Sequence, residues 1–408
     1  MQTQLTPEIL ATPQGREAET ILRACVHCGF CTATCPTYQL TGDELDGPRG
    51  RIYLIKQMLE GEVTTERTQY HLDRCLTCRA CETTCPSGVR YGRLVEIGRE
   101  VVEQKVSRPR EQRLLRQLLR SIVPYPRRFA TLLRVGSWFK PLLPPSLANK
   151  IYAVQKTKPH QPRHHARRVL ALSGCVQPVV APATNSAAAR LLDRLGITLL
   201  EVPQSGCCGA MSYHTGDHSD GLNFVRHNID CWWPHIETGV EALLITASGC
   251  GAFVKEYGEL LQHDPRYATK AARVAVLAKD LCELITPSDL QPYHRPNRPA
   301  IAFQNPCSLQ HGQKISGRVE ALLSAVGYPL TAVPESHLCC GSAGSYSLLQ
   351  PTMSQALLAR KLTALNSGSP TLIVSANIGC QLHLASQSSV PVKHWIELLA
   401  ESLDPIER

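Results

Sequence analysis

Short apolar runs alternate with stretches of helical spacing from residue 169 to the end of the chain. These runs are VLALS (169–173), LLEVP (199–203), ALLIT (242–246), AIAFQ (300–304), LTAVP (330–334) and TLIVSA (371–376). Runs of this length predict buried strands, and the stretches between them predict helices, two of which end at Gly196 and Gly327. Strands that alternate with helices predict an α/β fold with largely parallel sheets.

The first hundred residues follow a different pattern, without a series of strand-like runs. The stretch Arg51–Glu60 and the segment ERTQYHLDR (66–74) have helical spacing, which predicts an all-α module. From Leu114 to Pro145, Leu and Ile recur at helical spacing with Arg between them, and three prolines are expected to end these helices. The prolines are Pro124, Pro126 and Pro141.

Composition narrows the class of protein. Hydrophobic residues make up 43% and charged residues 19% of the 408 positions, which is ordinary for a globular protein. The sequence has no apolar run of 18 residues, and its first residues lack the basic start and apolar stretch of a secretory signal. We therefore expect a cytoplasmic protein whose 18 cysteines stay reduced and serve as metal ligands or redox groups.

The net charge of +9 is concentrated in one segment. Residues 104–168 contain sixteen Lys and Arg but one acid, Glu111, so the rest of the chain is acidic. Three interpretations fit: an interdomain linker, a helix pair that docks a partner, or a basic amphipathic surface for anionic lipid with Trp138 and Phe139 as interfacial anchors. Nucleic acid is not expected as a partner, because no binding motif accompanies the charge.

Eight cysteines near the N-terminus form two copies of C-x2-C-x2-C-x3-C-P, 50 residues apart. This is the bacterial ferredoxin pattern, in which the fourth cysteine of each run binds the cluster of the other run. The pattern predicts two [4Fe–4S] clusters with crossed ligands. Cluster 1 is assigned to Cys25, Cys28, Cys31 and Cys85, and cluster 2 to Cys75, Cys78, Cys81 and Cys35.

Zinc is the main alternative, since a single C-x2-C is also a zinc half-site. Two four-cysteine runs with trailing Pro36 and Pro86 favour iron–sulfur clusters instead. The connector between the runs is too long for a hairpin ferredoxin and favours a helical one. Crossed ligation also predicts that residues 20–90 need iron to fold.

A second cysteine pattern repeats in the C-terminal part. Cys175 and Cys307 are 132 residues apart, as are the two Cys-Cys-Gly sequences, and Cys250 and Cys380 are 130 apart. The pattern predicts a duplicated α/β unit whose thiols meet at the carboxyl ends of the strands. Candidate ligands for further iron–sulfur centres are Cys175, Cys207, Cys208 and Cys250 in one half, and Cys307, Cys339, Cys340 and Cys380 in the other. Vestigial sites and exchange-active dithiols remain alternatives, whereas Cys231 and Cys282 are expected to be buried.

No catalytic residue is proposed from the sequence. It contains no dinucleotide-binding glycine motif after a strand, no nucleophile elbow and no evident acid–base constellation. CCGSAGSY (339–346) is rich in glycine but does not fit a nucleotide-binding pattern.

The cysteine motifs and their surroundings resemble the cysteine-rich CCG family, which includes the iron–sulfur subunits of bacterial glycolate oxidases. The matching segments are LRACVHCGFCTATCPTYQL, GDELDGPRGRIYLIKQ, HLDRCLTC, CETTCPSGVRY, TASGCGAFVKEYG, SHLCCGSAG and ANIGCQ. The resemblance implies a helical two-cluster ferredoxin-like domain followed by two CCG domains. It also implies a complex in which flavin-bearing partner subunits, and not this chain, carry FAD and oxidise glycolate to glyoxylate.

One feature departs from the family pattern, which ends in C-x-x-C. Phe253 and His383 stand where each half would have a fifth thiol. This departure weakens thiol–disulfide catalysis more than it weakens electron transfer.

We therefore expect an electron-transfer subunit that passes electrons from glycolate, or from D-lactate, to a quinone-type acceptor on the cytoplasmic face of the bacterial inner membrane. Electron transfer for lactate or glycerol-3-phosphate oxidation, and a heterodisulfide-reductase-like enzyme, are the alternatives. The expected domains are 1–103 (ferredoxin-like), 104–168 (basic helical linker), 169–298 (first CCG domain) and 299–408 (second CCG domain).

Overall fold

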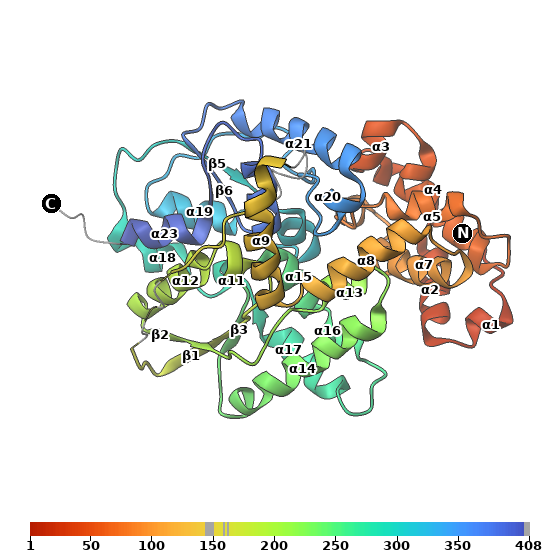
Figure 1. The fold of residues 1–408 in the computed structure, drawn as a ribbon, viewed down its shortest axis with the longest axis horizontal. Coiled ribbons are helices and arrows are strands. Elements are labelled where there is room, and N and C mark those ends of the chain that lie inside the picture. Colours follow the sequence, from red (N-terminus) through yellow and green to blue (C-terminus); the bar gives the residue numbers. More distant parts are fainter. Residues whose placement is uncertain (143–150, 158–159, 161–162, 404–408) are drawn as a thin grey trace.

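The computed structural model describes residues 1–142, 151–157, 160 and 163–403. Figure 1 shows a helical N-terminal part at one end and two sheet-containing parts at the other, with two long helices crossing between them. This is a mixed α/β molecule with an all-helical N-terminal region.

The N-terminal region packs short helices around the two cysteine loops. Its elements are α1 (Pro7–Leu10), α2 (Pro13–Ala24), η1 (Phe30–Thr32), α3 (Pro36–Thr41), η2 (Glu44–Asp46), α4 (Pro48–Leu59), α5 (Glu66–Asp73), α6 (Ala80–Thr84) and α7 (Tyr91–Lys105). Leu22, Ile55, Leu72 and Leu94 are fully buried in its core. Helix α4 begins at Pro48, before the expected Arg51, because proline is well suited to the first turn of a helix.

Helices α8 (Arg110–Ile122) and α9 (Pro126–Phe139) follow, separated where the sequence predicted a break, and η3 (Lys140–Leu142) continues from α9. Arg108, just before α8, forms ion pairs with Asp73 of α5 at 2.5 Å and with Glu103 of α7 at 2.6 Å. Leu133 of α9 packs in a small core with Val180 and Ile378, which come from the two sheet-containing parts.

The first sheet has four parallel strands in the order β2-β1-β3-β4. Its part of the chain contains β1 (Arg167–Ala171), α11 (Gln177–Val180), α12 (Ala183–Arg194), β2 (Ile197–Glu201), α13 (Ala210–His214), α14 (His218–Glu237), β3 (Ala242–Leu244), α15 (Ser248–Lys255), α16 (Tyr257–Leu260), α17 (Ala268–Leu277), β4 (Ala278–Lys279), η4 (Leu281–Glu283), α18 (Pro287–Leu290) and η5 (Gln291–Tyr293).

The second sheet has three parallel strands in the order β5-β6-β7. Its part contains β5 (Ile301–Gln304), η6 (Ser308–Gly312), α19 (Arg318–Ala325), α20 (Tyr346–Leu349), α21 (Pro351–Asn366), β6 (Leu372–Ser375), α22 (Ile378–Ala385), β7 (Val392–His394) and α23 (Trp395–Leu403). Helix α23 packs on α12, and one buried core runs from Val169 to Trp395 and so joins the two sheets.

One predicted strand is wrong. LTAVP (330–334) forms a single bridge, between Leu330 and Ile301, and no strand. Pro329 precedes this segment and Pro334 is its last residue. Proline has no N–H to donate to a neighbouring strand, so the pairing cannot extend past either end.

Candidate metal centres

The two N-terminal cysteine loops have the same backbone shape. Cys25 ends α2 and Cys75 follows α5, while Cys35 begins α3 and Cys85 ends α6. In the first loop the backbone is left-handed at His27 (φ 57°) and Gly29 (φ 87°). In the second loop it is left-handed at the corresponding Thr77 (φ 52°) and Arg79 (φ 62°). Left-handed residues curl the chain tightly, so each loop wraps around its own thiols.

The thiols gather into two groups, each around a small cavity. One cavity is lined by Cys25, Cys28, Cys31 and Cys85. The other is lined by Cys35, Cys75 and Cys78. Cys81 touches both cavities. The fourth cysteine of each run therefore lies with the first three of the other run.

The group around Cys75 has hydrogen-bond donors to sulfur. The Tyr91 hydroxyl donates to Cys75 Sγ at 3.5 Å, and the Thr77 N–H donates to the same atom at 3.4 Å. The Thr37 hydroxyl lies 3.3 Å from Cys35 Sγ but donates to the Asp46 carbonyl at 2.7 Å. Donors such as the Tyr91 hydroxyl and the Thr77 N–H favour the more negatively charged state of a metal–thiolate centre.

Positive charge also lies close to this group. Arg51 is fully buried, and its guanidinium donates to the His71 carbonyl at 2.7 Å and to Thr37 Oγ1 at 3.1 Å. Arg99 donates to the Cys75 carbonyl at 2.7 Å. Burial alone would raise the pKa of the Cys75 thiol, but Arg51 and Arg99, together with the hydrogen bonds from Tyr91 and Thr77, lower it.

The group around Cys25 is more open. Cys28 is exposed, and neighbouring Phe30 is 62% exposed. Burial and the nearby Cys25 raise the pKa of Cys31 to about 11. Burial likewise raises the pKa of Cys78 and Cys81 in the other group. A cation shared between such thiols favours their deprotonation, so both groups suit a metal centre.

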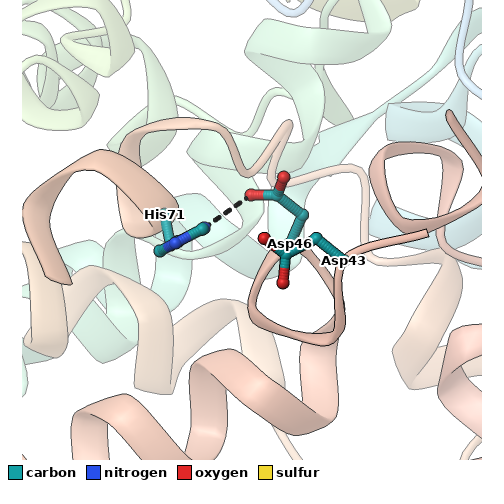
Figure 2. Close-up of side chains that lie close together, drawn as sticks. All are labelled: Asp43, Asp46 and His71. Carbon is teal, nitrogen blue, oxygen red and sulfur yellow. Dashed lines mark hydrogen bonds and ion pairs between the residues drawn. The ribbon is translucent and has the colours of Figure 1, made fainter. Parts of the chain in front are cut away.

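Figure 2 shows a third cluster of metal-ligating side-chain types, Asp43, Asp46 and His71. The Asp46 carbonyl lies 3.7 Å from Cys35 Sγ, so this cluster lies beside the second group. The buried Asp46 carboxylate already pairs with His71 Nδ1 at 2.9 Å, with Arg74 Nη1 at 2.5 Å and with Arg51 Nη2 at 3.5 Å. Asp43 caps η2 through the Leu45 N–H. Two arginines neutralise Asp46, so this cluster is a structural ion-pair hub that holds α4 and α5 beside Cys35.

The C-terminal cysteines occupy matching places after the strands. In the first sheet-containing part, Cys175 follows β1, Cys207 and Cys208 follow β2, and Cys250 lies in the first turn of α15. Hydrogen bonds from the thiols of Cys175 and Cys208 hold the pKa of Cys207 well below its ordinary value. The four thiols therefore form one contiguous set.

The second set has the same arrangement. Cys307 follows β5, Cys339 and Cys340 precede α20, and Cys380 lies in the first turn of α22. The Cys307 thiol donates to Cys339 Sγ at 3.7 Å. The Gly341 N–H donates to Cys339 Sγ at 3.4 Å, as the Gly209 N–H does to Cys207 Sγ at 3.5 Å in the other set.

Both C-terminal sets open on one cavity of about 730 Å³ between the N-terminal region and the two sheets. Its lining includes Cys75 and Cys78 besides members of both sets. Cys78 shares a buried patch with Cys307 and Cys339. The Tyr346 hydroxyl donates to the Arg74 carbonyl at 3.1 Å across the same boundary. The N-terminal group around Cys75 and the second C-terminal set are therefore direct neighbours.

The positions without a fifth thiol carry other buried side chains. Phe253 is buried among aromatic rings, 5.4 Å from the Tyr213 ring. His383 Nε2 lies 3.1 Å from Ser354 Oγ. Outside the sets, Cys282 is buried as expected, but Cys231 is only half-buried, because α14 turns it toward His227 at the surface.

Sequence reasoning found the sixteen clustered cysteines but missed the side chains around them. Arg51, Arg99, Tyr91 and Lys361 come from helices whose spacing from the cysteines matches no known motif. The one available signal was a charged residue on the apolar face of a helix, as with Arg51 in RIYLIKQML.

Two family models match this chain. One, a 4Fe-4S dicluster domain, matches residues 21–89. The other, a cysteine-rich domain named CCG, matches twice, at residues 169–255 and 301–385. The two CCG matches fall within the parts that contain the parallel sheets, and each match ends before the last strand of its sheet, β4 or β7.

Curated proteins similar to this chain include the glycolate oxidase iron-sulfur subunit of Escherichia coli K12, which is 56% identical over 99% of this chain and 100% of that protein. A probable glycolate oxidase iron-sulfur subunit of Bacillus subtilis is 30% identical over 93% of both chains. One chain of a heterodisulfide reductase from Methanosarcina barkeri is 24% identical over 94% of both. A hypothetical protein from Helicobacter pylori shares the fold, with a TM-score of 0.55, 11% identity, and coverage of 96% of this chain and 72% of that one.

Proposed function

The chain belongs to the family of glycolate oxidase iron–sulfur subunits, and we propose that it carries the electrons released by glycolate oxidation. It is an electron-transfer subunit of an oxidoreductase complex. A partner flavoprotein, which carries FAD, oxidises glycolate to glyoxylate, and this chain passes the electrons to a quinone-type acceptor. D-lactate is a second donor substrate to test, because nothing in this chain's own residues selects glycolate.

We assign Cys25, Cys28, Cys31 and Cys85 to cluster 1, and Cys75, Cys78, Cys81 and Cys35 to cluster 2. The observation that carries this assignment is the crossed grouping of the eight thiols around two cavities. Bound [4Fe–4S] clusters accept and release single electrons. Tyr91, the Thr77 N–H and Arg51 would stabilise the reduced state at the second site, since they bring donors and positive charge to its sulfurs.

The C-terminal thiols are proposed to hold further iron–sulfur centres. The contact of Cys78 with Cys307 and Cys339 supports a path from the second N-terminal site into the second CCG domain. We also propose that the two CCG domains arose by duplication, with the domains divided as 1–103, 104–168, 169–298 and 299–408. A heterodisulfide-reductase-like activity would use the cavity that the two sets share, but each set lacks a fifth thiol at Phe253 or His383.

The segment 104–168 is proposed as a peripheral contact with the cytoplasmic face of the bacterial inner membrane. Among described residues, no helix is both long and apolar enough to span a bilayer. Instead α8 and α9 expose apolar side chains among many arginines. The exposed set is Leu114, Leu115, Leu118, Leu132, Val135, Trp138, Phe139 and Leu142. A basic amphipathic face with aromatic residues suits an anionic lipid surface.

Variants of the N-terminal cysteines test the electron-transfer role. We expect Cys25→Ser and Cys78→Ser each to lose one cluster signal and about four iron atoms, and the assembled complex to lose acceptor reduction while glycolate still reduces its flavin. Cys231→Ser is the matched control, because Cys231 lies half-buried on α14 outside all four sets. Full acceptor reduction after the loss of both clusters would refute the proposal.

A further inference from the structure

In each CCG domain one helix packs against the Cys-Cys-Gly sequence, α14 in the first domain and α21 in the second, and the two helices make the same contacts. A Cβ on Gly209 would meet the Gly221 carbonyl and the Phe224 side chain of α14. A Cβ on Gly341 would meet the Ser354 carbonyl and the Leu357 side chain of α21. Residues 221 and 224 of α14 therefore correspond to residues 354 and 357 of α21.

One turn further along, the two helices differ in charge. Asn228 of α14 corresponds to Lys361 of α21, and both side chains are buried. Asn228 is neutral and well bonded: it accepts from the Gly206 N–H at 2.9 Å and donates to the Cys207 carbonyl at 2.7 Å. Lys361 carries an ammonium group that donates to the carbonyls of Glu335 at 3.1 Å and Ser336 at 3.2 Å.

No ion pair joins Lys361 to a carboxylate of the described chain. The carboxylate of Glu335 pairs with Arg360 at the surface instead. Leu358 and Leu362, on either side of Lys361 in α21, share a buried core with Cys340 and Cys380, so this helix brings Lys361 beside the second cysteine set. Burial lowers the pKa of Lys361, and the four cysteines of that set act against burial. A lysine that is 3% exposed is costly to bury unless negative charge lies nearby, and these four sulfurs are the charge that a metal-bound site would supply.

We propose that Lys361 is the counter-charge of an anionic iron–sulfur centre held by Cys307, Cys339, Cys340 and Cys380, and that it makes the two CCG domains unequal as electron acceptors. The inference rests on the proposed function. A fixed positive charge in a dry site favours the more negative, reduced state, so the second domain should have the higher reduction potential. Asn228 gives the first domain no such charge.

The second CCG domain, which contains Lys361, is also the one that adjoins the second N-terminal site. Cys307 and Cys339 are the thiols that lie beside Cys78 of the second N-terminal site. The domain with the buried cation is therefore the one in contact with the N-terminal thiols. Lys361 acts here as a positioning charge, since its ammonium group bonds to carbonyl oxygens and not to sulfur in any described contact.

A redox titration of the anaerobic full-length chain, followed by electron paramagnetic resonance, tests the proposal. The signal lost in Cys307→Ser identifies the second domain, and the signal lost in Cys175→Ser identifies the first. In the unmodified chain the second-domain signal should appear at the higher potential. In Lys361→Met this signal should shift to lower potential, while Lys361→Arg should keep it near the original value. Lys314→Met is the matched control, since Lys314 is exposed in the same domain.

An unshifted second-domain signal in Lys361→Met would overturn the proposal, as would a higher potential for the first domain in the unmodified chain. If Lys361→Met loses iron, the order of the two potentials in the unmodified chain still decides. Finding iron only in the two N-terminal clusters would also overturn the proposal for Lys361, but it would leave the electron-transfer role intact. Absence of the N-terminal cluster signals would instead overturn the electron-transfer role.

Discussion

Individual hydrogen bonds to sulfur distinguish the two N-terminal sites. The Tyr91 hydroxyl donates to Cys75 Sγ from the start of α7, and the Thr77 N–H donates to the same sulfur from the second cysteine loop. Cys28 in the other group is exposed to solvent. The Tyr91 contact arises because α7 begins close to the end of the second cysteine loop.

Tyr91→Phe should lower the reduction potential of the cluster whose signal disappears in Cys78→Ser. The ring would still fill its buried place, but the hydroxyl that stabilises the reduced sulfur would be gone. A redox titration of the full-length chain measures the shift. Tyr53→Phe serves as the control, because the Tyr53 ring is 46% exposed. An unchanged midpoint in Tyr91→Phe would show that this hydroxyl does not tune the site.

At the residue level, the sequence predicted the cysteine groups because metal ligation fixes the spacing of ligands. The charged residues around the cysteines have no fixed spacing from them. Packing between segments that are distant in sequence brings Arg51 and Lys361 to their sites, so no local pattern could assign them.

Among the described helices of eight or more residues, α8 and α9 have the fewest buried residues. The buried residues are Arg116 and Leu119 on α8 and Leu133 on α9. The rest of the pair faces outward or is partly covered, with Trp138 79% exposed. In Figure 1 the pair crosses one face of the molecule, between the N-terminal helices and the sheets.

We expect the full-length chain to sediment with vesicles that contain anionic phosphatidylglycerol, and less with neutral phosphatidylcholine vesicles. Binding should fall as salt rises from about 0.1 M to 1 M, because the Debye length shrinks from about 10 Å to about 3 Å. Replacing Trp138 and Phe139 by Ser should weaken binding, whereas Val276→Ser, at a 66% exposed site in α17, should not. Equal binding to neutral vesicles at all salt concentrations would contradict a charged contact.

Element prediction succeeded where hydrophobic spacing was regular and failed where pairing depended on partners. The breaks of α8 and α9 follow from prolines in the sequence. LTAVP has residue types typical of a strand, but Pro329 before it and Pro334 at its end prevent a ladder. Strand β7 (Val392–His394) was missed, because two half-buried residues and one buried residue give no periodic signal and take their place only by pairing with β6.

Across the whole molecule, the two sheet-containing parts are joined through buried groups. His394 on β7 lies 2.9 Å from the Thr246 carbonyl after β3, with Nε2 assigned as the donor. The Ile396 N–H donates to His394 Nδ1 at 3.3 Å. The neutral imidazole uses both ring nitrogens in hydrogen bonds, one as donor and one as acceptor. A second proton on Nδ1 would remove the acceptor and break the hydrogen bond from the Ile396 N–H.

Burial lowers the pKa of His394 to about 4, from an ordinary value of 6.5. The unfolded chain therefore binds a proton before the folded chain does. Stability is fully present above pH 6.5 and falls as the pH drops toward 4, by roughly 3 kcal/mol at most. Urea unfolding across this pH range should show a smaller fall for His394→Gln than for the unmodified chain. The exposed His263→Gln should behave like the unmodified chain, and identical pH profiles for His394→Gln and wild type would contradict the assignment.

Reduction of this chain by glycolate in the assembled complex tests most directly whether its clusters carry the electrons of the reaction. Glycolate is added without oxygen to the complex purified with its flavoprotein partner, and electron paramagnetic resonance follows the cluster signals. We expect the signal that Cys78→Ser lacks to appear as glycolate is consumed. A complex whose flavin becomes reduced while this chain stays silent, or a chain loaded with zinc, would contradict the account.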